Sequence, residues 1–141
     1  MKGNWKGYYT YDKKSLQSRI GSSGTYFELT ITDFDGKQFT GKVEDEEESG
    51  GTPGIGTVVG TKRNNEISFI KKMPVKAVMD QGGDKYILRG KHPDIYYHGI
   101  FNGNDKIIEG TWRIKFGIVC LAGFPVPMLP TKGKFRMEMA D

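Results

Sequence analysis

Apolar and polar residues alternate along most of the chain, and alternation with a period of two predicts short β-strands. In one such stretch Phe27, Leu29 and Ile31 alternate with a glutamate and two threonines. Turn-forming pairs such as Asp35-Gly36 separate the stretches. The pattern predicts nine strands, over residues 5–11, 27–32, 39–43, 55–61, 66–71, 85–90, 95–101, 106–116 and 132–139.

Helical periodicity is confined to two short stretches. Leu16 and Ile20 lie four residues apart within residues 12–20, and residues 74–80 open with Pro74, a residue favoured at the first position of a helix. Each stretch predicts one or two helical turns, which are too short to bridge parallel strands. The sequence therefore predicts one all-β domain spanning residues 1–141, an antiparallel up-and-down meander of about 8–10 strands.

The meander is expected to close into a barrel. An open meander exposes two edge strands, whereas closure removes both edges. Glycines within the strands at positions 7, 41, 60 and 110 are typical of places where a curved wall bends. An open sandwich of two sheets is the main alternative. Seven aromatic residues lie in phase and are expected to face one interior: Trp5, Phe27, Phe39, Phe69, Tyr97, Trp112 and Phe135.

The amino-acid composition agrees with a β fold. Only 3 alanines and 5 leucines stand against 29 β-branched residues (Ile, Val and Thr) and 17 aromatic ones. The single cysteine, Cys120, rules out an intramolecular disulfide, and the start of the chain has no apolar secretory segment. The longest uncharged stretch, between Lys115 and Lys132, is interrupted by three prolines, which argues against a membrane-spanning helix. We therefore expect a cytoplasmic protein with no membrane partner.

The charge distribution gives no indication of a nucleic-acid partner. The net charge is +4, and the cations occur singly or in pairs such as Lys13-Lys14, Lys62-Arg63 and Lys71-Lys72 rather than in one cluster. This scatter is typical of solvated strand faces and turns. The acidic run 44–48 lacks the ligand spacing of a calcium loop, and the glycine-rich residues 50–56 lack the lysine and helix of a phosphate loop. Both predict a solvated, mobile connection.

The first strand opens with Gly3-Asn4-Trp5, which resembles the Gly-x-Trp opening of the calycin barrels, the group that includes lipocalins, fatty-acid-binding proteins and avidins. The resemblance implies a barrel in which Trp5 packs across a closed end and an arginine of the last strand, here Arg136, covers it, with Lys134 as the other candidate. Further short motifs are similar to strands of small bacterial calycin-like barrels of unassigned function: Phe39-Thr40-Gly41, Val59-Gly60-Thr61, Ile67-Ser68-Phe69, Tyr97-His98-Gly99, Glu109-Gly110-Thr111-Trp112 and Gly133-Lys134-Phe135.

The chain departs from each of these calycin families in one respect. It cannot form the disulfide that is usual in lipocalins, because it has one cysteine. Residues 12–24 are too short for the helical hairpin of fatty-acid-binding proteins. The biotin contacts of avidins have no counterparts that can be placed residue by residue. The resemblance therefore implies a barrel and only suggests a cavity.

Catalytic and metal-binding motifs are missing from the sequence. There is no Gly-x-Ser-x-Gly elbow, and His92, His98 and Cys120 lack the spacing of a triad or a zinc site. His98 alternates with Tyr97, so we expect it on the outer face, where it could not reach a haem inside the barrel. Cys120 lies between two aliphatic residues and is expected to be a buried, inert thiol. We expect no catalytic residue, no metal site and no cofactor.

Residues 117–131 stand out because they are apolar and contain prolines at positions 125, 127 and 130. Proline lacks the N–H group that a central strand needs. We therefore expect the eighth strand to run to about Leu121, followed by extended, unpaired backbone that plugs one end of the barrel. The alternative is an apolar lip used for ligand entry or for a protein partner, including a homodimer formed through residues 117–131.

The expected function is the binding of a small, largely apolar ligand inside the barrel, since a barrel of this size can hold one such molecule. Bulky aromatic side chains could also fill the interior, so the alternative is a structural or protein-interaction domain without a ligand. A third hypothesis, an enzyme that uses His98 or Tyr97 with Glu109, is supported by no motif. The expected ligand contacts are Tyr9, Phe27, Phe39, Phe69, Tyr97, Trp112, Phe124 and Phe135.

Overall fold

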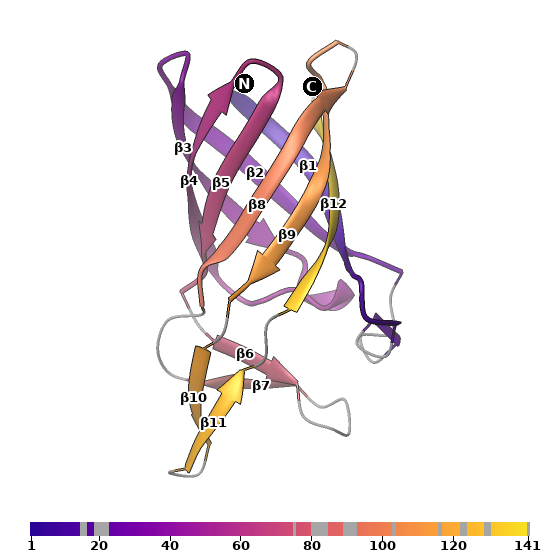
Figure 1. The fold of residues 1–141 in the computed structure, drawn as a ribbon, viewed down its shortest axis with the longest axis vertical. Helices are drawn as coiled ribbons and strands as arrows, with labels where there is room; N and C mark the ends of the chain where they lie inside the picture. Colours follow the sequence, from indigo (N-terminus) through magenta and orange to yellow (C-terminus); the bar gives the residue numbers. More distant parts are fainter. Residues whose placement is uncertain are drawn as a thin grey trace.

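An eight-stranded antiparallel β-barrel forms the body of the molecule (Figure 1). The structure is a computed structural model and describes residues 1–14, 17–18, 23–74, 76–79, 85–88, 93–102, 104–115, 117–121, 124–128 and 131–140. The barrel strands are β1 (Gly3–Tyr11), β2 (Thr25–Phe34), β3 (Gln38–Asp45), β4 (Ile55–Arg63), β5 (Glu66–Lys72), β8 (Ile95–Asn102), β9 (Ile107–Ile114) and β12 (Thr131–Ala140).

The barrel strands pair in up-and-down order, and the last strand, β12, returns to pair with β1. In this closing pair Trp5 lies opposite Met139, and Tyr9 lies opposite Phe135. Closure gives every barrel strand a partner on both sides, which removes the exposed edges of an open meander. The predicted all-β meander and its closure are confirmed, and the open sandwich is not the architecture.

Close approach between neighbouring strands accounts for the glycines in the barrel wall. A side chain at Gly41 would overlap the carbonyl oxygen of Thr30 on β2, and one at Gly110 would overlap that of His98 on β8. Side chains at positions 7 and 60 would meet the backbone of the next strand in the same way. The strand glycines therefore let adjacent strands approach closely where the wall curves.

The two ends of the barrel differ in their connections. Both chain termini and the tight turns between β2 and β3, β4 and β5, and β8 and β9 gather at one end, which we call the turn end (Figure 1). The long connections from β1 to β2, β3 to β4, β5 to β8 and β9 to β12 gather at the other end, the loop end. In an up-and-down barrel alternate connections lie at the same end, so this separation follows from the order of turn lengths along the chain.

Two additional hairpins lie beyond the loop end (Figure 1). One of them pairs β6 (Lys76–Met79) with β7 (Lys85–Leu88) and is inserted between β5 and β8. The other pairs β10 (Gly117–Leu121) with β11 (Phe124–Met128) and is inserted between β9 and β12. The strand predicted over residues 85–90 therefore exists as β7, but it belongs to a hairpin and not to the barrel wall.

Three local predictions in this region are wrong. The eighth strand, predicted to run to about Leu121, ends at Ile114 as β9, and Gly117–Leu121 belong to β10 of the second hairpin. The helix predicted over residues 74–80 is replaced by β6, because pairing with β7 outweighs the preference of proline for a helix start. The unpaired backbone predicted after Leu121 is replaced by β11, where Pro125 lies opposite Cys120. A two-stranded hairpin consists only of edge strands, so the missing N–H groups of prolines are tolerated there. The side chains of both hairpins lie outside the described residues, and so do the predicted roles of Phe124 and Cys120.

The predicted helical turn over residues 12–20 is described only in part. The amide of Gln17 donates to the carbonyl of Lys13 across 3.2 Å, which is a bond of the helical type. The side-chain oxygen of Gln17 accepts a hydrogen bond from the amide of Tyr11 at 2.8 Å. The remainder of this turn lies outside the described residues.

The acidic run is built into the barrel and does not stand apart as a solvated loop. Asp45 ends β3 and is buried, and Glu47–Ser49 form a short 3-10 turn, η1. The hydroxyl of Thr25 donates to the carbonyl of Ser49 at 2.8 Å, and the amide of Tyr26 donates to the Ser49 hydroxyl at 3.0 Å. The prediction of a solvated loop is therefore wrong for Asp45 and Ser49, because bonds to β2 hold this segment against the loop end.

Candidate functional site

The interior of the barrel is filled with aromatic residues whose rings touch one another. Phe69 and Tyr97 stack with ring centres 4.6 Å apart and planes 9° from parallel. Phe135 meets Tyr97 edge-on at 5.0 Å, and Phe39 meets Phe69 at 6.1 Å. Stacked and edge-on pairs of this kind are favourable packing arrangements. The structure therefore brings seven of the eight predicted ligand contacts into one buried core: Tyr9, Phe27, Phe39, Phe69, Tyr97, Trp112 and Phe135.

Near the loop end, the aromatic core carries polar groups. Trp112 meets Tyr9 and Tyr11 edge-on, with ring centres 5.6 and 5.1 Å away. The indole N–H of Trp112 donates to the carbonyl of Thr10 at 3.0 Å. This half of the interior therefore combines apolar ring faces with phenol and indole groups that form hydrogen bonds.

A buried ion pair lies among these rings. Lys71 and Asp45 lie near the loop-end termini of β5 and β3, and the Nζ atom of Lys71 is 2.5 Å from a carboxylate oxygen of Asp45. Their side chains are only 2% and 1% exposed. The Tyr9 hydroxyl donates to the second carboxylate oxygen at 3.4 Å, and the amide of Thr52 approaches the same atom at 3.5 Å. One buried carboxylate thus connects three strands and the segment that follows β3.

Aromatic rings surround the lysine ammonium group. Its nitrogen lies 5.1 Å from the ring centre of Tyr9, 5.6 Å from that of Phe27 and 6.0 Å from that of Tyr97. A cation within about 6 Å of an aromatic face is attracted by the quadrupole of the ring. Three of the residues predicted to contact an apolar ligand therefore contact a cation of the chain itself.

The sequence-based predictions missed both charged residues, although the strand pattern contained a signal for each. Lys71 continues the inward phase of Ile67 and Phe69 along β5, and Asp45 continues that of Val43 along β3. Lys71 belongs to a lysine pair and Asp45 to an acidic run, so both were assigned to solvated positions. A charged residue in phase with buried neighbours is the pattern that could have identified them.

Burial also changes the acidity of the phenol groups in this region. Burial, followed by the nearby carboxylate of Asp45, raises the pKa values of Tyr9 and Tyr97 well above the ordinary value of 10.0. The same two causes raise the pKa of Tyr11 to about 12. The three hydroxyls therefore stay protonated to a higher pH than an exposed phenol would, and while protonated they can donate hydrogen bonds.

The ion pair is costly to bury and therefore calls for an explanation other than stability. Each charge loses its hydration, and a buried pair often stabilises a protein no more than apolar residues of similar volume. Buried ionisable groups in a concave, aromatic environment are frequent at functional sites. We take this region as the candidate functional site and call it the loop-end cluster, defined as Tyr9, Phe27, Asp45, Lys71, Tyr97 and Trp112.

Trp5 lies in the interior at the turn end, whereas Arg136 lies on the other side of the wall. Trp5 is completely buried, its indole N–H donates to the carbonyl of Met1 at 2.8 Å, and its ring meets Phe101 edge-on at 6.3 Å. Arg136 follows the inward-facing Phe135 on β12 and therefore points outward, where its guanidinium bonds Glu109 at 3.1 Å. Arg136 thus does not cover the indole as the resemblance implies, and Lys134 is exposed on the same outer side.

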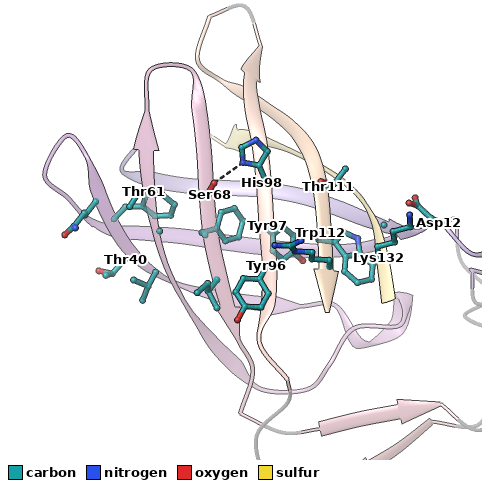
Figure 2. Close-up of a pocket in the computed structure, with 18 residues that line it drawn as sticks. Asp12, Thr40, Thr61, Ser68, Tyr96, Tyr97, His98, Thr111, Trp112 and Lys132 are labelled. Carbon is teal, nitrogen blue, oxygen red and sulfur yellow. Dashed lines mark hydrogen bonds between the residues drawn. The ribbon is translucent and has the colours of Figure 1, made fainter. Parts of the chain in front are cut away.

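The outer wall carries a hollow of about 950 Å³ that crosses six neighbouring strands, from β3 through β4, β5, β8 and β9 to β12 (Figure 2). Paired positions on successive strands form one row of its lining: Val59, Ile70, Tyr96, Arg113 and Lys132. The row passes from aliphatic residues through one aromatic ring to two cations. This surface contains a second candidate binding region, whose lining shares Tyr97 and Trp112 with the loop-end cluster.

His98 belongs to this outer surface. Its side chain is exposed, and its Nδ1 atom lies 2.9 Å from the hydroxyl oxygen of Ser68 (Figure 2). The outward orientation predicted for His98 is confirmed, so this imidazole is not available as a ligand inside the barrel. Glu109 is also exposed on the outer wall, while Tyr97 faces the interior. Tyr97 and Glu109 therefore lie on opposite faces of the wall, and none of the hydrogen bonds among the described residues joins His98 to Glu109.

Neither metal-ligating side chains nor similarity to a known protein assigns a role to these regions. In the part of the chain that the structure describes, no group of three or more His, Cys, Asp or Glu side chains is placed to hold a metal ion. None of the helices in the described ranges has the length and apolar character needed to cross a membrane. No protein-family model, no curated protein and no solved structure matches the chain. The fold and the site define a small, closed antiparallel β-barrel with a buried ion pair.

Proposed function

We propose that the chain is a calycin-like barrel that binds a small, largely apolar ligand at the loop end of its interior. The observation that carries the proposal is the Lys71–Asp45 pair, buried among aromatic rings inside a closed barrel. Small-molecule sites are mostly apolar and contain a few placed polar groups that orient the ligand. The loop-end cluster has this composition, and seven of the residues expected to contact a ligand are buried in the same core.

The arrangement of the connections supports entry at the loop end. All four long connections leave the barrel there, whereas the turn end has tight turns above the buried Trp5. The segment between β3 and β4 is held to β2 by two hydrogen bonds to Ser49. Releasing one surface segment requires less free energy than separating two strands of the wall. The loop end is therefore the easier route into the interior.

The packing of the rings limits what the ligand can be. The rings of the loop-end cluster already contact one another, as Trp112 contacts Tyr9, so a ligand must displace part of these contacts. A flat or slender apolar body can insert between ring faces with little loss of packing. A single polar group on that body would find the phenol of Tyr9 or the ammonium of Lys71. We propose a small molecule of this kind.

Native mass spectrometry of protein purified without denaturation tests the proposal. We expect a population heavier than the bare chain by one small molecule, and we expect this mass difference to vanish when the chain is unfolded. A folded protein that shows only the bare mass after exposure to cell extract, and that also fails the dye measurement below, would contradict the proposal.

Binding of the neutral apolar dye N-phenyl-1-naphthylamine gives a second test. Ile95 faces inward at the loop-end start of β8, and Ile100 faces outward on the same strand. Ile95→Trp should block the entrance and raise the dissociation constant of the dye at least about tenfold. Ile100→Trp adds the same volume on the outer wall and serves as the matched control, with no expected change. Equal affinities for both variants would place the dye outside the barrel.

The second candidate function is a structural or protein-interaction domain with a filled interior. The stack of Phe69 on Tyr97 and the edge contact with Phe135 favour it, because these rings occupy the middle of the barrel. A homodimer through residues 117–131 belongs to this alternative and rests on their apolar sequence alone. In native mass spectrometry, a monomer mass equal to that of the chain alone, together with a dimer peak, would support this function over ligand binding.

A further inference from the structure

We infer that two complementary faces of the outer wall bind two copies of this chain head to tail. One face, the basic face, is the hollow row defined above: Val59, Ile70, Tyr96, Arg113 and Lys132. The other, the acidic face, lies over β3, β2, β1 and β12 around Tyr8 and Tyr26, and its hollow is lined by four exposed glutamates, Glu28, Glu44, Glu46 and Glu138, and by two cations, Lys6 and Arg136. The inference concerns the outside of the barrel and does not depend on a ligand inside it.

The cations of the basic face, and Lys115 at its border, have no acidic partner in the part of the chain that the structure describes. None of the ion pairs found among the described residues involves Arg113, Lys115 or Lys132. Arg113 and Lys115 instead lie 5.9 and 4.5 Å from the ring centre of Tyr96. Val59, at the other end of the row on β4, is 53% exposed. Pairing of β8, β9 and β12 thus gathers cations that are scattered in the sequence at one end of a row whose other end is aliphatic.

The acidic face is the counterpart of this arrangement. It contains a hollow of about 680 Å³ in which the rings of Tyr8 and Tyr26 lie 6.1 Å apart and are 39% and 51% exposed. Glu28 lies 3.7 Å from Lys6, whereas Glu44 and Glu46 form no ion pair with any described residue. Both faces thus combine tyrosine with charge, although Tyr96 of the basic face is half-buried, and tyrosine and arginine are enriched at protein interfaces.

The strand order places the two faces on opposite sides of the barrel. The tyrosines of the acidic face lie on β1 and β2, and the hollow of the basic face centres on β5 and β8, four strands away in a ring of eight, with its cations on β9 and β12. The two faces of one chain therefore cannot meet each other. The acidic face of one copy can meet the basic face of the next, which is a heterologous contact that extends into a chain of copies. Opposite charge steers such an encounter and is screened by salt.

A second copy is the occupant that the structure itself supplies, because both complementary surfaces belong to this chain. Two variants separate the faces. Arg113→Glu with Lys132→Glu reverses the basic face and leaves the acidic one intact, and Glu44→Lys with Glu46→Lys does the opposite. All four side chains are exposed, so neither variant disturbs the core. If a charge-reversed variant does not give the wild-type circular dichroism spectrum, the corresponding double alanine variant replaces it in the experiment.

Sedimentation velocity of the wild type and both variants tests the inference. In ~10 mM salt, where the Debye length is about 30 Å, we expect concentration-dependent association of the wild type that weakens at least about tenfold in ~1 M salt. Each variant alone should remain monomeric, and an equal mixture should associate again, since the intact faces of the two variants meet and their reversed faces are also opposite in charge. A wild type that stays monomeric at all concentrations overturns the inference. This holds even if the basic face of that monomer binds an oligonucleotide or an acidic peptide. Association that survives both reversals but is lost in Phe124→Asp with Leu129→Asp also overturns it.

Discussion

The ammonium nitrogen of Lys71 lies 2.5 Å from a carboxylate oxygen of Asp45, and the two side chains are buried inside a barrel whose core otherwise consists mainly of aromatic and aliphatic side chains. The two residues belong to β5 and β3, which are separated in the wall by β4. The contact therefore crosses the interior at the loop end. It ties together two strands that share no backbone hydrogen bond.

Removing one member of this pair should be more harmful than removing both. Lys71→Met or Asp45→Leu leaves a buried charge without a partner and should lower the free energy of unfolding by about 3–5 kcal/mol. The double variant removes both charges and should regain most of that loss. Urea unfolding measures the free energy of unfolding of the two single variants and the double variant. Additive losses in the double variant would mean that the two charges do not interact as described.

The buried phenols should resist ionisation while the protein is folded. The folded-state pKa of Tyr11 is raised to about 12, and those of Tyr9 and Tyr97 are also raised. The unfolded chain ionises near pH 10, so this contribution to stability is complete below about pH 10 and is lost as the pH rises beyond it.

Ultraviolet absorbance of phenolate checks this prediction. It should rise in two phases, and the later phase should coincide with unfolding. Tyr11→Phe should reduce that later phase. A single phase near pH 10 in a folded protein would show that the phenols are open to solvent.

Trp5 should contribute strongly to stability at the turn end. Its side chain is completely buried and packs on Phe101, so Trp5→Ala should cost about 3–5 kcal/mol. Arg136→Ala is the control, because its exposed pair with Glu109 should be worth less than about 1 kcal/mol. Denaturant titration compares the two. A loss under about 1 kcal/mol for Trp5→Ala would remove the main sequence feature behind the calycin-like proposal.

The apolar residues of the β10–β11 region should matter for stability or assembly. Phe124→Asp with Leu129→Asp places two carboxylates in a segment whose sequence is apolar, and a buried carboxylate without a partner is costly. We expect a lower melting temperature or dissociation of a dimer. Wild-type values for both the melting temperature and the mass in solution would show that the segment is exposed.

The wall of the barrel was predictable because its signals are local. Alternation such as that of Phe27, Leu29 and Ile31 sets which face of a strand is buried, and turn pairs mark where strands end. The two extra hairpins were not predictable, since the proline signals at Pro74 and Pro125 were outweighed by pairing with a neighbouring strand.

The loop-end cluster was predictable only in part. Its aromatic members follow from strand phase, but the partner of Lys71 is 26 residues away and is fixed by the geometry of the closed barrel. The outward position of Arg136 could have been inferred from strand phase, because it adjoins the inward Phe135. The clustering of cations on the basic face could not be inferred from the sequence, because it is the pairing of β9 with β12 that brings Arg113 and Lys132 together.

The two tryptophans provide the most direct test of ligand binding at the loop end. Trp112 belongs to the loop-end cluster and donates its indole N–H to Thr10, whereas Trp5 lies at the turn end and donates to Met1. Each gives its own indole signal in a ¹H–¹⁵N correlation spectrum. Titration with N-phenyl-1-naphthylamine should move the Trp112 signal in a saturable way and leave the Trp5 signal in place. Two unmoved signals, or movement of the Trp5 signal alone, would contradict the proposed site.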